Sequence, residues 1–270
     1  MQSPVFQTEP GASSGGQAAP AAREMVAILD YGSQYSRLIA RRVRECRVYC
    51  ELLPADTTLD ELRRLGARGV ILSGGPDSVY DDGARKVDQE VLESDLPVLG
   101  ICYGMQLLAH QLGGHVERHS GRSEYGPSEI HLVETVQRDD TAQRLFAGLA
   151  TGSGIAVWMS HGDTVSEVPP GFAPIARSES GALAAMGDAR GRIGIQFHPE
   201  VRHTPQGSEI LENFLFGICG CTPSWTAGAF IDEAVERIRA QVGDAGRLIC
   251  GLSGGVDSAV AALLVHRAIG

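Results

Sequence analysis

The apolar and polar positions of residues 25–113 predict strands and helices in alternation. Each strand is expected as a short apolar run before a turn, and each helix as apolar residues at helical spacing. The expected strands are residues 26–29, 48–53, 70–72 and 97–101. Thr58 and Glu61 predict a capping box at the start of the second helix. Buried strands that alternate with helices predict a parallel sheet covered on both faces, as in doubly wound α/β proteins.

The pattern changes after Gly113. Apolar residues there alternate with polar ones or form short runs between turns, which predicts an antiparallel extension of the sheet. The expected strands lie around residues 130–132, 155–159, 182–186 and 192–197, and a helix is expected over residues 210–218. The predicted fold class is therefore α/β, with a mostly parallel sheet and an antiparallel extension.

A second unit is expected after a boundary rich in glycine, serine and proline at residues 219–226. The sequence predicts a helix around 230–238, a strand at 247–250, a loop at 251–258 and a helix at 259–269. One strand and two helices cannot bury a core, so we predict that residues 223–270 are the truncated start of a second α/β nucleotide-binding domain. Residues 25–222 are the predicted first domain, and residues 1–24 a predicted disordered tail.

Composition and charge narrow the expected partners. The chain carries 23 basic and 33 acidic residues, and its net charge of −10 argues against nucleic acid. The six cysteines show no C-x-x-C pair and no disulfide-framework spacing, which indicates reduced thiols in a cytoplasmic protein. The sequence has no apolar run long enough to span a bilayer and no signal-peptide pattern, so no membrane partner is expected.

The first candidate for chemistry is Cys102, at the predicted joint between a strand and a helix. Gly100 and Gly104 flank it in the G-x-C-x-G pattern of a nucleophile elbow, where glycine avoids collisions with neighbouring backbone. Such an elbow would hold the sulfur above free helix N–H groups, which favour the thiolate. The competing interpretation is a small buried hydrophobic residue in a strand.

The triplet His198-Pro199-Glu200 supplies a candidate base and its partner. Residues two apart in an extended segment project to the same side, and Pro199 restrains His198 toward that conformation. Glu200 could then accept one imidazole N–H and leave the other nitrogen for Cys102, the arrangement of nucleophilic acyl transfer. A surface histidine and a solvated loop charge are the alternatives.

The stretch Ser73-Gly74-Gly75-Pro76 follows a predicted strand. It is either an ordinary glycine–proline turn or one wall of an oxyanion hole, because a tetrahedral intermediate needs backbone donors aimed at its developing charge. We assign one donor to the N–H of Gly75 and the other to that of Tyr103, the residue after the candidate nucleophile.

These motifs together resemble the class I glutamine amidotransferase family over about residues 25–222. The resemblance implies that Cys102 attacks the side-chain amide of glutamine with the help of His198 and Glu200. It also implies that Gln106, Ser160 and His161 bind the substrate glutamine, although a structural loop remains the alternative for the last two. Residues 28–35, 158–163 and 196–201 narrow the resemblance to members that aminate XMP to GMP.

A separate motif, S-G-G-V-D-S, lies between the predicted strand at 247–250 and the last predicted helix. Small residues there would expose backbone N–H groups at a helix N-terminus, where pyrophosphate binds. The motif resembles the pyrophosphate-binding loop of ATP pyrophosphatases, although members often have serine in place of Ala259. The resemblance implies ATP binding by Ser253, Gly254, Gly255, Val256, Asp257, Ser258 and Ala259.

The two resemblances together imply a complete reaction for an intact enzyme. Its glutaminase half would need no cofactor, whereas its second domain would use ATP with Mg²⁺ to activate XMP, and the full-length protein would be a homodimer. Another class I amidotransferase, serving chorismate, carbamoyl phosphate or CTP chemistry, is one alternative, and the S-G-G-V-D-S loop argues against it. A non-catalytic regulatory domain and a cysteine peptidase are further alternatives; the intact Cys102, His198 and Glu200 argue against the regulatory domain.

Overall fold

The computed structural model describes residues 24–118, 123–133, 144–149, 154–243 and 246–270, so nearly all of the predicted tail at 1–24 lies outside the described residues. Its strands are β1 (Met25–Asp30), β2 (Cys50–Pro54), β3 (Ala67–Leu72), β4 (Val98–Ile101), β5 (His115–Glu117), β6 (Glu124–Leu132), β7 (Ile155–His161), β8 (Thr164–Glu167), β9 (Ala173–Ser178), β10 (Leu183–Gly187) and β11 (Arg192–Ile195). Its helices are α1 (Ser36–Glu45), α2 (Leu59–Arg64), α3 (Gln89–Glu93), α4 (Tyr103–Gln111), α6 (Gly207–Glu212), the π-helix η1 (Asn213–Ile218), α7 (Ala227–Val242) and α8 (Val256–Ile269).

The described strands form one large sheet with the predicted mixture of directions. Its order is β2-β1-β3-β4-β11-β10-β9-β6-β7, and β5 pairs with β8 in a separate small sheet. Neighbours from β2 to β11 are parallel, whereas those from β11 to β7 are antiparallel. The predicted α/β fold with an antiparallel extension is therefore confirmed.

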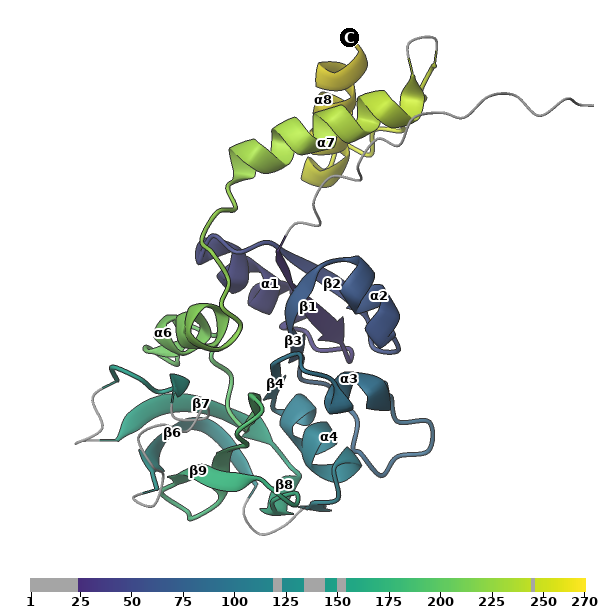
Figure 1. Cartoon of the computed structure of the whole chain (residues 1–270). Coiled ribbons are helices and arrows are strands. Elements are labelled where there is room, and N and C mark those ends of the chain that lie inside the picture. Colours follow the sequence, from purple (N-terminus) through teal and green to yellow (C-terminus); the bar gives the residue numbers. More distant parts are fainter. Residues whose placement is uncertain (1–23, 119–122, 134–143, 150–153, 244–245) are drawn as a thin grey trace, which may run out of the picture.

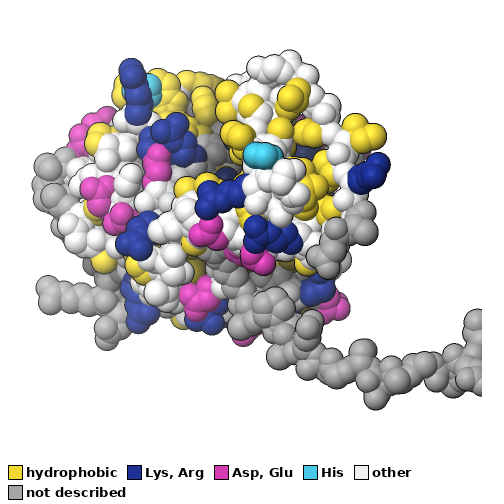
Figure 2. Space-filling view, turned by 90° about the horizontal axis from the view of Figure 1, so that it is seen from above, with side chains coloured by type: hydrophobic (Ala, Val, Ile, Leu, Met, Phe, Trp, Pro, Cys, Tyr) yellow, Lys and Arg dark blue, Asp and Glu magenta, His cyan; other side chains and the backbone are white. Residues whose placement is uncertain are grey.

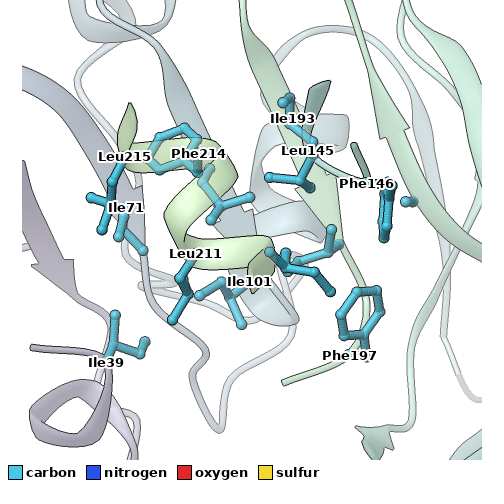
Figure 3. Close-up of a cluster of buried hydrophobic side chains, with 14 of the residues drawn as sticks. Ile39, Ile71, Ile101, Leu145, Phe146, Ile193, Phe197, Leu211, Phe214 and Leu215 are labelled. Atoms are coloured by element: carbon cyan, nitrogen blue, oxygen red, sulfur yellow. The ribbon is translucent and has the colours of Figure 1, made fainter. Parts of the chain in front are cut away.

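Helices cover both faces of the parallel strands (Figure 1). Side chains of β3 alternate between two cores, since Ile71 packs with α1, α6 and η1 while Leu72 packs with α2, α3 and α4. Figure 3 shows the first of these cores, with Ile71 beside Leu211 and Leu215 of the α6–η1 segment. The Thr58 hydroxyl accepts from the Glu61 N–H and so caps α2, as the sequence predicts.

The antiparallel strands curl back toward the parallel ones. β7 is the last strand in the order of the sheet, yet Met159 of β7 forms an isolated bridge with Phe197, just beyond β11. The His198 N–H donates to the Trp158 carbonyl oxygen at 3.0 Å beside this bridge. This closure brings the residues that follow β11 next to the end of β7.

The C-terminal segment consists of α7 and α8, which pack against each other through contacts such as the hydrogen bond from Arg239 Nε to the Ala268 carbonyl oxygen (Figure 1). The predicted strand at 247–250 is wrong, because these residues are irregular and Ile249 is 99% exposed. A strand needs a hydrogen-bonded neighbour, and the described strands offer none to this segment. Figure 2, which views the molecule from this end, shows apolar side chains on the exposed surface.

Among the described residues, the helices include none that is long and apolar enough to cross a membrane. The predicted cytoplasmic location and the predicted domain boundary after residue 222 stay predictions.

Candidate active site

Cys102 occupies a strained turn between β4 and α4. Its φ of 53° and ψ of −106° are unusual for a residue with a side chain, a type of strain that clusters at functional sites. A Cβ atom on Gly100 would lie 2.5 Å from backbone atoms of Gly104, and one on Gly104 would lie 2.4 Å from the Leu72 carbonyl oxygen. Both glycines are therefore required by close backbone approaches around the turn.

The Cys102 thiol is nearly enclosed, since the residue is 6% exposed. Its sulfur donates to the carbonyl oxygen of Ser160 at 3.4 Å, and Gln196 Nε2 donates to the sulfur at 3.8 Å. The Cys102 thiol, directly after β4, thus contacts a backbone carbonyl group of β7.

His198 and Glu200 form a buried pair beside this thiol. The imidazole Nδ1 lies 2.8 Å from Glu200 Oε1, and because a carboxylate can only accept, the ring nitrogen donates. Burial lowers the pKa of His198, but hydrogen bonding and charge from Cys102 and Glu200 outweigh burial and raise this pKa to about 10. The structure therefore brings the three residues together: His198 pairs with Glu200, and a Cβ on Gly74 would lie 3.4 Å from the His198 ring and 3.8 Å from the Cβ of Cys102.

Three neighbours that the sequence did not single out hold this pair. The ring of Tyr35 contacts the His198 imidazole edge-on, with 5.4 Å between centroids. Arg42 Nε donates to the Glu200 carbonyl oxygen at 3.0 Å, and the Thr204 hydroxyl donates to the His198 carbonyl oxygen at 2.6 Å. The contacts of Tyr35 and Arg42 join distant parts of the chain, so residue spacing carried no signal for them, whereas Thr204 lies six residues beyond His198 in the same segment before α6.

The two candidate oxyanion donors come from separate elements, one in the turn after β3 and one at the start of α4. Within the described part of the chain, neither the Gly75 nor the Tyr103 N–H has a hydrogen-bond acceptor. A Cβ on Gly75 would lie 2.8 Å from the Tyr31 carbonyl oxygen, so glycine is required for the close approach of this turn. Both residues line the same cavity as Cys102.

This cavity has a volume of about 430 Å³. Its lining includes Gly75, Cys102, Tyr103, Gln106, Ser160, His161 and Asp163, whereas His198 and Glu200 are not part of the lining. A larger cavity of about 590 Å³ next to Asp30 and Arg85 does not include Cys102. The smaller cavity is therefore the candidate substrate pocket.

Asp163 organises one wall of this pocket. Its carbonyl oxygen accepts from Gln106 Nε2 at 2.9 Å and lies 3.0 Å from His161 Nδ1, while its carboxylate accepts from the Ser78 hydroxyl at 2.6 Å. The His161 ring also lies 3.4 Å from a Glu124 carboxylate oxygen, and burial lowers its pKa. The sequence pointed to Asp163 only as part of a turn, because its side-chain partner is 85 residues away.

The predicted ATP-binding residues Ser253 to Ala259 lie apart from this pocket, at the start of α8 (Figure 1). Gly255 is the N-cap residue of α8, and the Ser258 hydroxyl donates to the Gly255 carbonyl oxygen at 2.9 Å. Nearly all of the loop is exposed. The described residues include no cluster of three or more His, Cys, Asp and Glu side chains that could hold a metal ion.

Comparisons with known proteins show the family of the chain and its fold. The model of the family "Glutamine amidotransferase class-I" matches residues 27–218. A protein of Thermomicrobium roseum named GMP synthase [glutamine-hydrolyzing] is 56% identical over 248 residues, which cover 92% of this chain and 45% of that protein. A protein of the same name from Carboxydothermus hydrogenoformans is 52% identical over 91% of this chain and 46% of its own length. The chain thus spans about half the length of the curated relatives it matches.

Solved structures show the same fold. A Thermoplasma acidophilum protein proposed to be one of the subunits of GMP synthase has a TM-score of 0.61 and 28% identity, covering 75% of this chain and 96% of its own. A glutamine amidotransferase of Thermotoga maritima has a TM-score of 0.56 and 19% identity, covering 74% and 99%. Because the family model matches most of the chain and includes the Cys102, His198 and Glu200 cluster, this chain belongs to the class I glutamine amidotransferase family.

Proposed function

We propose that the chain hydrolyses glutamine to glutamate and ammonia, with Cys102 as nucleophile. One observation carries the proposal: the buried His198 imidazole donates to Glu200 from Nδ1 and lies beside Cys102, which lines a pocket. A cysteine, a histidine and a carboxylate in this order are suited to acyl transfer. The names of the relatives and the matching family support glutamine as the amide that is cleaved.

The first half of the proposed reaction forms a thioester. With the proton of the Cys102–His198 pair on the imidazole, the Cys102 thiolate attacks the side-chain amide carbon of glutamine, so that the carbonyl oxygen becomes an oxyanion between the N–H groups of Gly75 and Tyr103. The raised pKa of His198 keeps the imidazole protonated at neutral pH. It can therefore protonate the departing nitrogen, which leaves as ammonia when the intermediate collapses.

The second half releases glutamate. His198, now neutral, takes a proton from water, and the resulting hydroxide attacks the thioester carbonyl carbon. Collapse of the second oxyanion breaks the carbon–sulfur bond, releasing the glutamate side-chain carboxylate and returning Cys102 and His198 to their starting state. Glu200 orients the imidazole and stabilises its protonated form in both halves.

The Gln106 and Asp163 pair is the proposed determinant of the pocket that holds glutamine. Gln106 is buried and its amide is fixed on the Asp163 backbone, so its side-chain oxygen has a set direction. Ser160 and His161 contribute a further part of the wall, together with Gly75 and Tyr103. These substrate-binding roles are part of the proposal.

In a protein of the length of the relatives, we propose that the ammonia is used to aminate XMP to GMP. The Ser253 to Ala259 loop would bind the phosphates of ATP. ATP, as its Mg²⁺ complex, would be a substrate of the reaction and would convert the C2 oxygen of XMP into an adenylate. Ammonia would then displace AMP. The relatives' name and the exposed loop at the start of α8 support this assignment, which includes a homodimer as the assembly of the longer protein.

Substitution of the nucleophile tests the proposal. Cys102→Ala should abolish glutamate and ammonia formation from glutamine, and an electrophilic glutamine analogue should label native protein at Cys102 only. Cys250→Ala is the matched control, since Cys250 is exposed and lies outside the pocket lining; this variant should keep full activity and labelling. Labelling detects a competent nucleophile even where turnover depends on the rest of a longer protein.

Two results would contradict the proposal. Undiminished hydrolysis by Cys102→Ala would remove the cysteine from the mechanism. Absence of labelling at Cys102 in the native chain would favour the alternative of a non-catalytic glutaminase-like domain, and cleavage of peptides in place of glutamine would favour a peptidase.

A further inference from the structure

Glu124 is a mostly buried carboxylate that contacts the wall of the candidate substrate pocket. It begins β6 and pairs in the sheet with His161, the last residue of β7, which runs beside β6 (Figure 1). The side chain of His161 is 0% exposed and that of Glu124 is 14% exposed. His161 is among the residues that line the pocket. An imidazole and a carboxylate are thus enclosed together next to the space for the substrate.

The hydrogen bonds of His161 fix which ring nitrogen carries a proton. Nδ1 lies 3.0 Å from the Asp163 carbonyl oxygen, and because a carbonyl group can only accept, Nδ1 donates. A neutral imidazole has a single N–H, so Nε2 would then be an acceptor. Nε2 lies 3.4 Å from Glu124 Oε2, which also only accepts when the carboxylate is ionised. The described residues offer neither of these two buried atoms a hydrogen-bond partner.

One proton between the two atoms satisfies both. On Nε2, the proton makes the ring an imidazolium that donates to the carboxylate; on Oε2, it lets the carboxyl group donate to the ring. Either arrangement removes the free-energy cost of two buried acceptors without donors. The distance between the two atoms and their burial therefore indicate a pair that holds one proton in common.

Groups from three elements act on the charge of His161. Burial lowers the pKa of His161, and the charge of His198, after β11, adds to this effect. The Asp163 carbonyl oxygen, after β7, and the Glu124 carboxylate, in β6, raise the pKa of His161, but burial outweighs them. The pair should therefore lose its proton as pH rises from the acidic side toward neutrality.

The pair also acts on the part of the wall that holds Gln106. The Asp163 carbonyl oxygen accepts from His161 Nδ1 and from Gln106 Nε2, the latter at 2.9 Å. The other oxygen of Glu124 accepts from the Ser180 hydroxyl at 2.9 Å, which fixes the carboxylate. Since Ser180 holds Glu124 in place, repulsion between Oε2 and Nε2 acts on the His161 ring and so on the Asp163 turn.

We propose that Glu124 is a positioning residue of the glutamine pocket, which shares one proton with His161 and so keeps the Asp163 turn against Gln106. This role rests on the proposed function, which makes glutamine the molecule that the pocket binds. While the pair holds the proton, Nε2 and Oε2 attract each other and the wall is in place. When rising pH removes the proton to solvent, the two acceptors repel each other and the pocket binds glutamine less tightly.

Two substitutions of Glu124 test this role. Glu124→Gln supplies a permanent N–H to Nε2 and an oxygen to Ser180, so its KM for glutamine should match that of the native chain at the acidic end of the assay range. Glu124→Leu supplies neither and should raise KM there about tenfold, as expected for the loss of a hydrogen bond between charged groups. In both variants kcat should change less than about twofold, because Cys102 and His198 keep their contacts.

The pH dependence of KM distinguishes a shared proton from a purely structural role. Between about pH 5 and pH 8, KM of the native chain should rise relative to that of Glu124→Gln, because only the native pair can lose its proton. Ionisation of glutamine, Cys102 or His198 occurs in both proteins and cancels in this ratio. Glu129→Leu is the matched control, since Glu129 also lies in β6 and pairs with His131 at 3.8 Å, but its side chain is 40% exposed. Its KM should follow the native curve.

Nitrogen NMR of the His161 ring in the whole chain tests the pair without turnover, with the signals assigned from their loss in His161→Gln. Nitrogen chemical shifts distinguish a protonated ring nitrogen from an unprotonated one. In the native chain, Nδ1 should stay protonated throughout, and the signal of Nε2 should change as the shared proton is lost. In Glu124→Gln, Nε2 should remain an unprotonated acceptor at every pH.

The outcomes separate this role from the proposed function. A chain that neither hydrolyses glutamine nor is labelled at Cys102 would refute the proposed function and with it the role of Glu124 toward glutamine. In an active chain, the role is overturned if Glu124→Leu keeps the native KM or if Glu129→Leu raises KM equally. It is also overturned if Glu124→Gln shows the native pH dependence of KM or of the His161 nitrogen shifts. Where Glu124→Leu fails to fold, the comparison of Glu124→Gln with the native chain still decides the question.

Discussion

Tyr35 packs its ring against the imidazole of His198. The two rings meet edge-on with an interplanar angle of 67°, and Tyr35 is 37% exposed whereas His198 is 4% exposed. Tyr35 is the N-cap residue of α1, so the first turn of this helix fixes the position of the ring. The candidate catalytic histidine is therefore packed between Glu200 on its own segment and an aromatic ring from the N-terminal part of the chain.

Removal of this ring should reduce the rate of glutamine hydrolysis. An edge-on aromatic contact is worth about 0.5–1.5 kcal/mol, so Tyr35→Ala should lower kcat by roughly 2-fold to 10-fold. KM for glutamine should change little, because Tyr35 is outside the lining of the pocket. Tyr35→Phe keeps the ring and should keep the native kcat; a rise in KM with unchanged kcat would show that Tyr35 acts on substrate binding instead.

Glu200→Gln should reduce hydrolysis by on the order of 100-fold with the fold retained. The amide is close to the carboxylate in shape, but it lacks the charge that holds Nδ1 and favours the imidazolium. Steady-state turnover measures the loss, and circular dichroism checks the fold. Unchanged turnover in a folded variant would exclude Glu200 from the reaction.

The stability of the protein should fall as pH rises, because of His198. Its pKa is raised from 6.5 to about 10, so the folded state holds a proton that the unfolded chain has already released at intermediate pH. This contribution is complete below pH 6.5 and is lost as pH rises through about 10. Urea unfolding at several pH values should show the difference between native protein and Glu200→Gln shrinking over this window, and a constant difference would contradict it.

Gly104→Ala should destabilise the fold. The new Cβ would lie 2.4 Å from the Leu72 carbonyl oxygen and 2.8 Å from its Cβ, so backbone has to move. Overpacking of this kind costs about 1–3 kcal/mol of unfolding free energy. Gly217→Ala is the control, because a Cβ there meets nothing within 4 Å, and urea unfolding should show that variant close to native stability. Equal stability of both variants would contradict the steric requirement at the elbow.

The sequence alone predicted the parts of the fold that depend on local pattern. The apolar runs of β1, β3 and β4 and the helices between them follow from periodicity, and the strained turn at Cys102 follows from its two glycines. His198 and Glu200 are two residues apart on one segment, so their pairing could also be predicted. In each of these features the residues concerned lie close together in the sequence. Residue chemistry and backbone geometry therefore allow few arrangements of them.

Contacts between distant segments could not be predicted in the same way. Nothing in the spacing indicates that Arg42 reaches the Glu200 carbonyl oxygen, 158 residues away, or that Ser78 reaches Asp163. The strand expected at 247–250 failed for a related reason, since apolar composition favours a strand but a neighbouring strand has to stabilise it. Tertiary partners, which a single sequence does not display, decided these cases.

The contact of Cys102 with the Ser160 carbonyl oxygen joins the end of β4, in the middle of the sheet order, to β7, the last strand in that order. A chain that has built only the parallel strands, from β2 to β11, has the cysteine and the segment with His198 but lacks β7, which supplies part of the pocket proposed to hold glutamine. Under the proposed function, the reaction of the sulfur with glutamine therefore requires the antiparallel extension as well as the parallel strands, so ammonia release should depend on a completely folded domain.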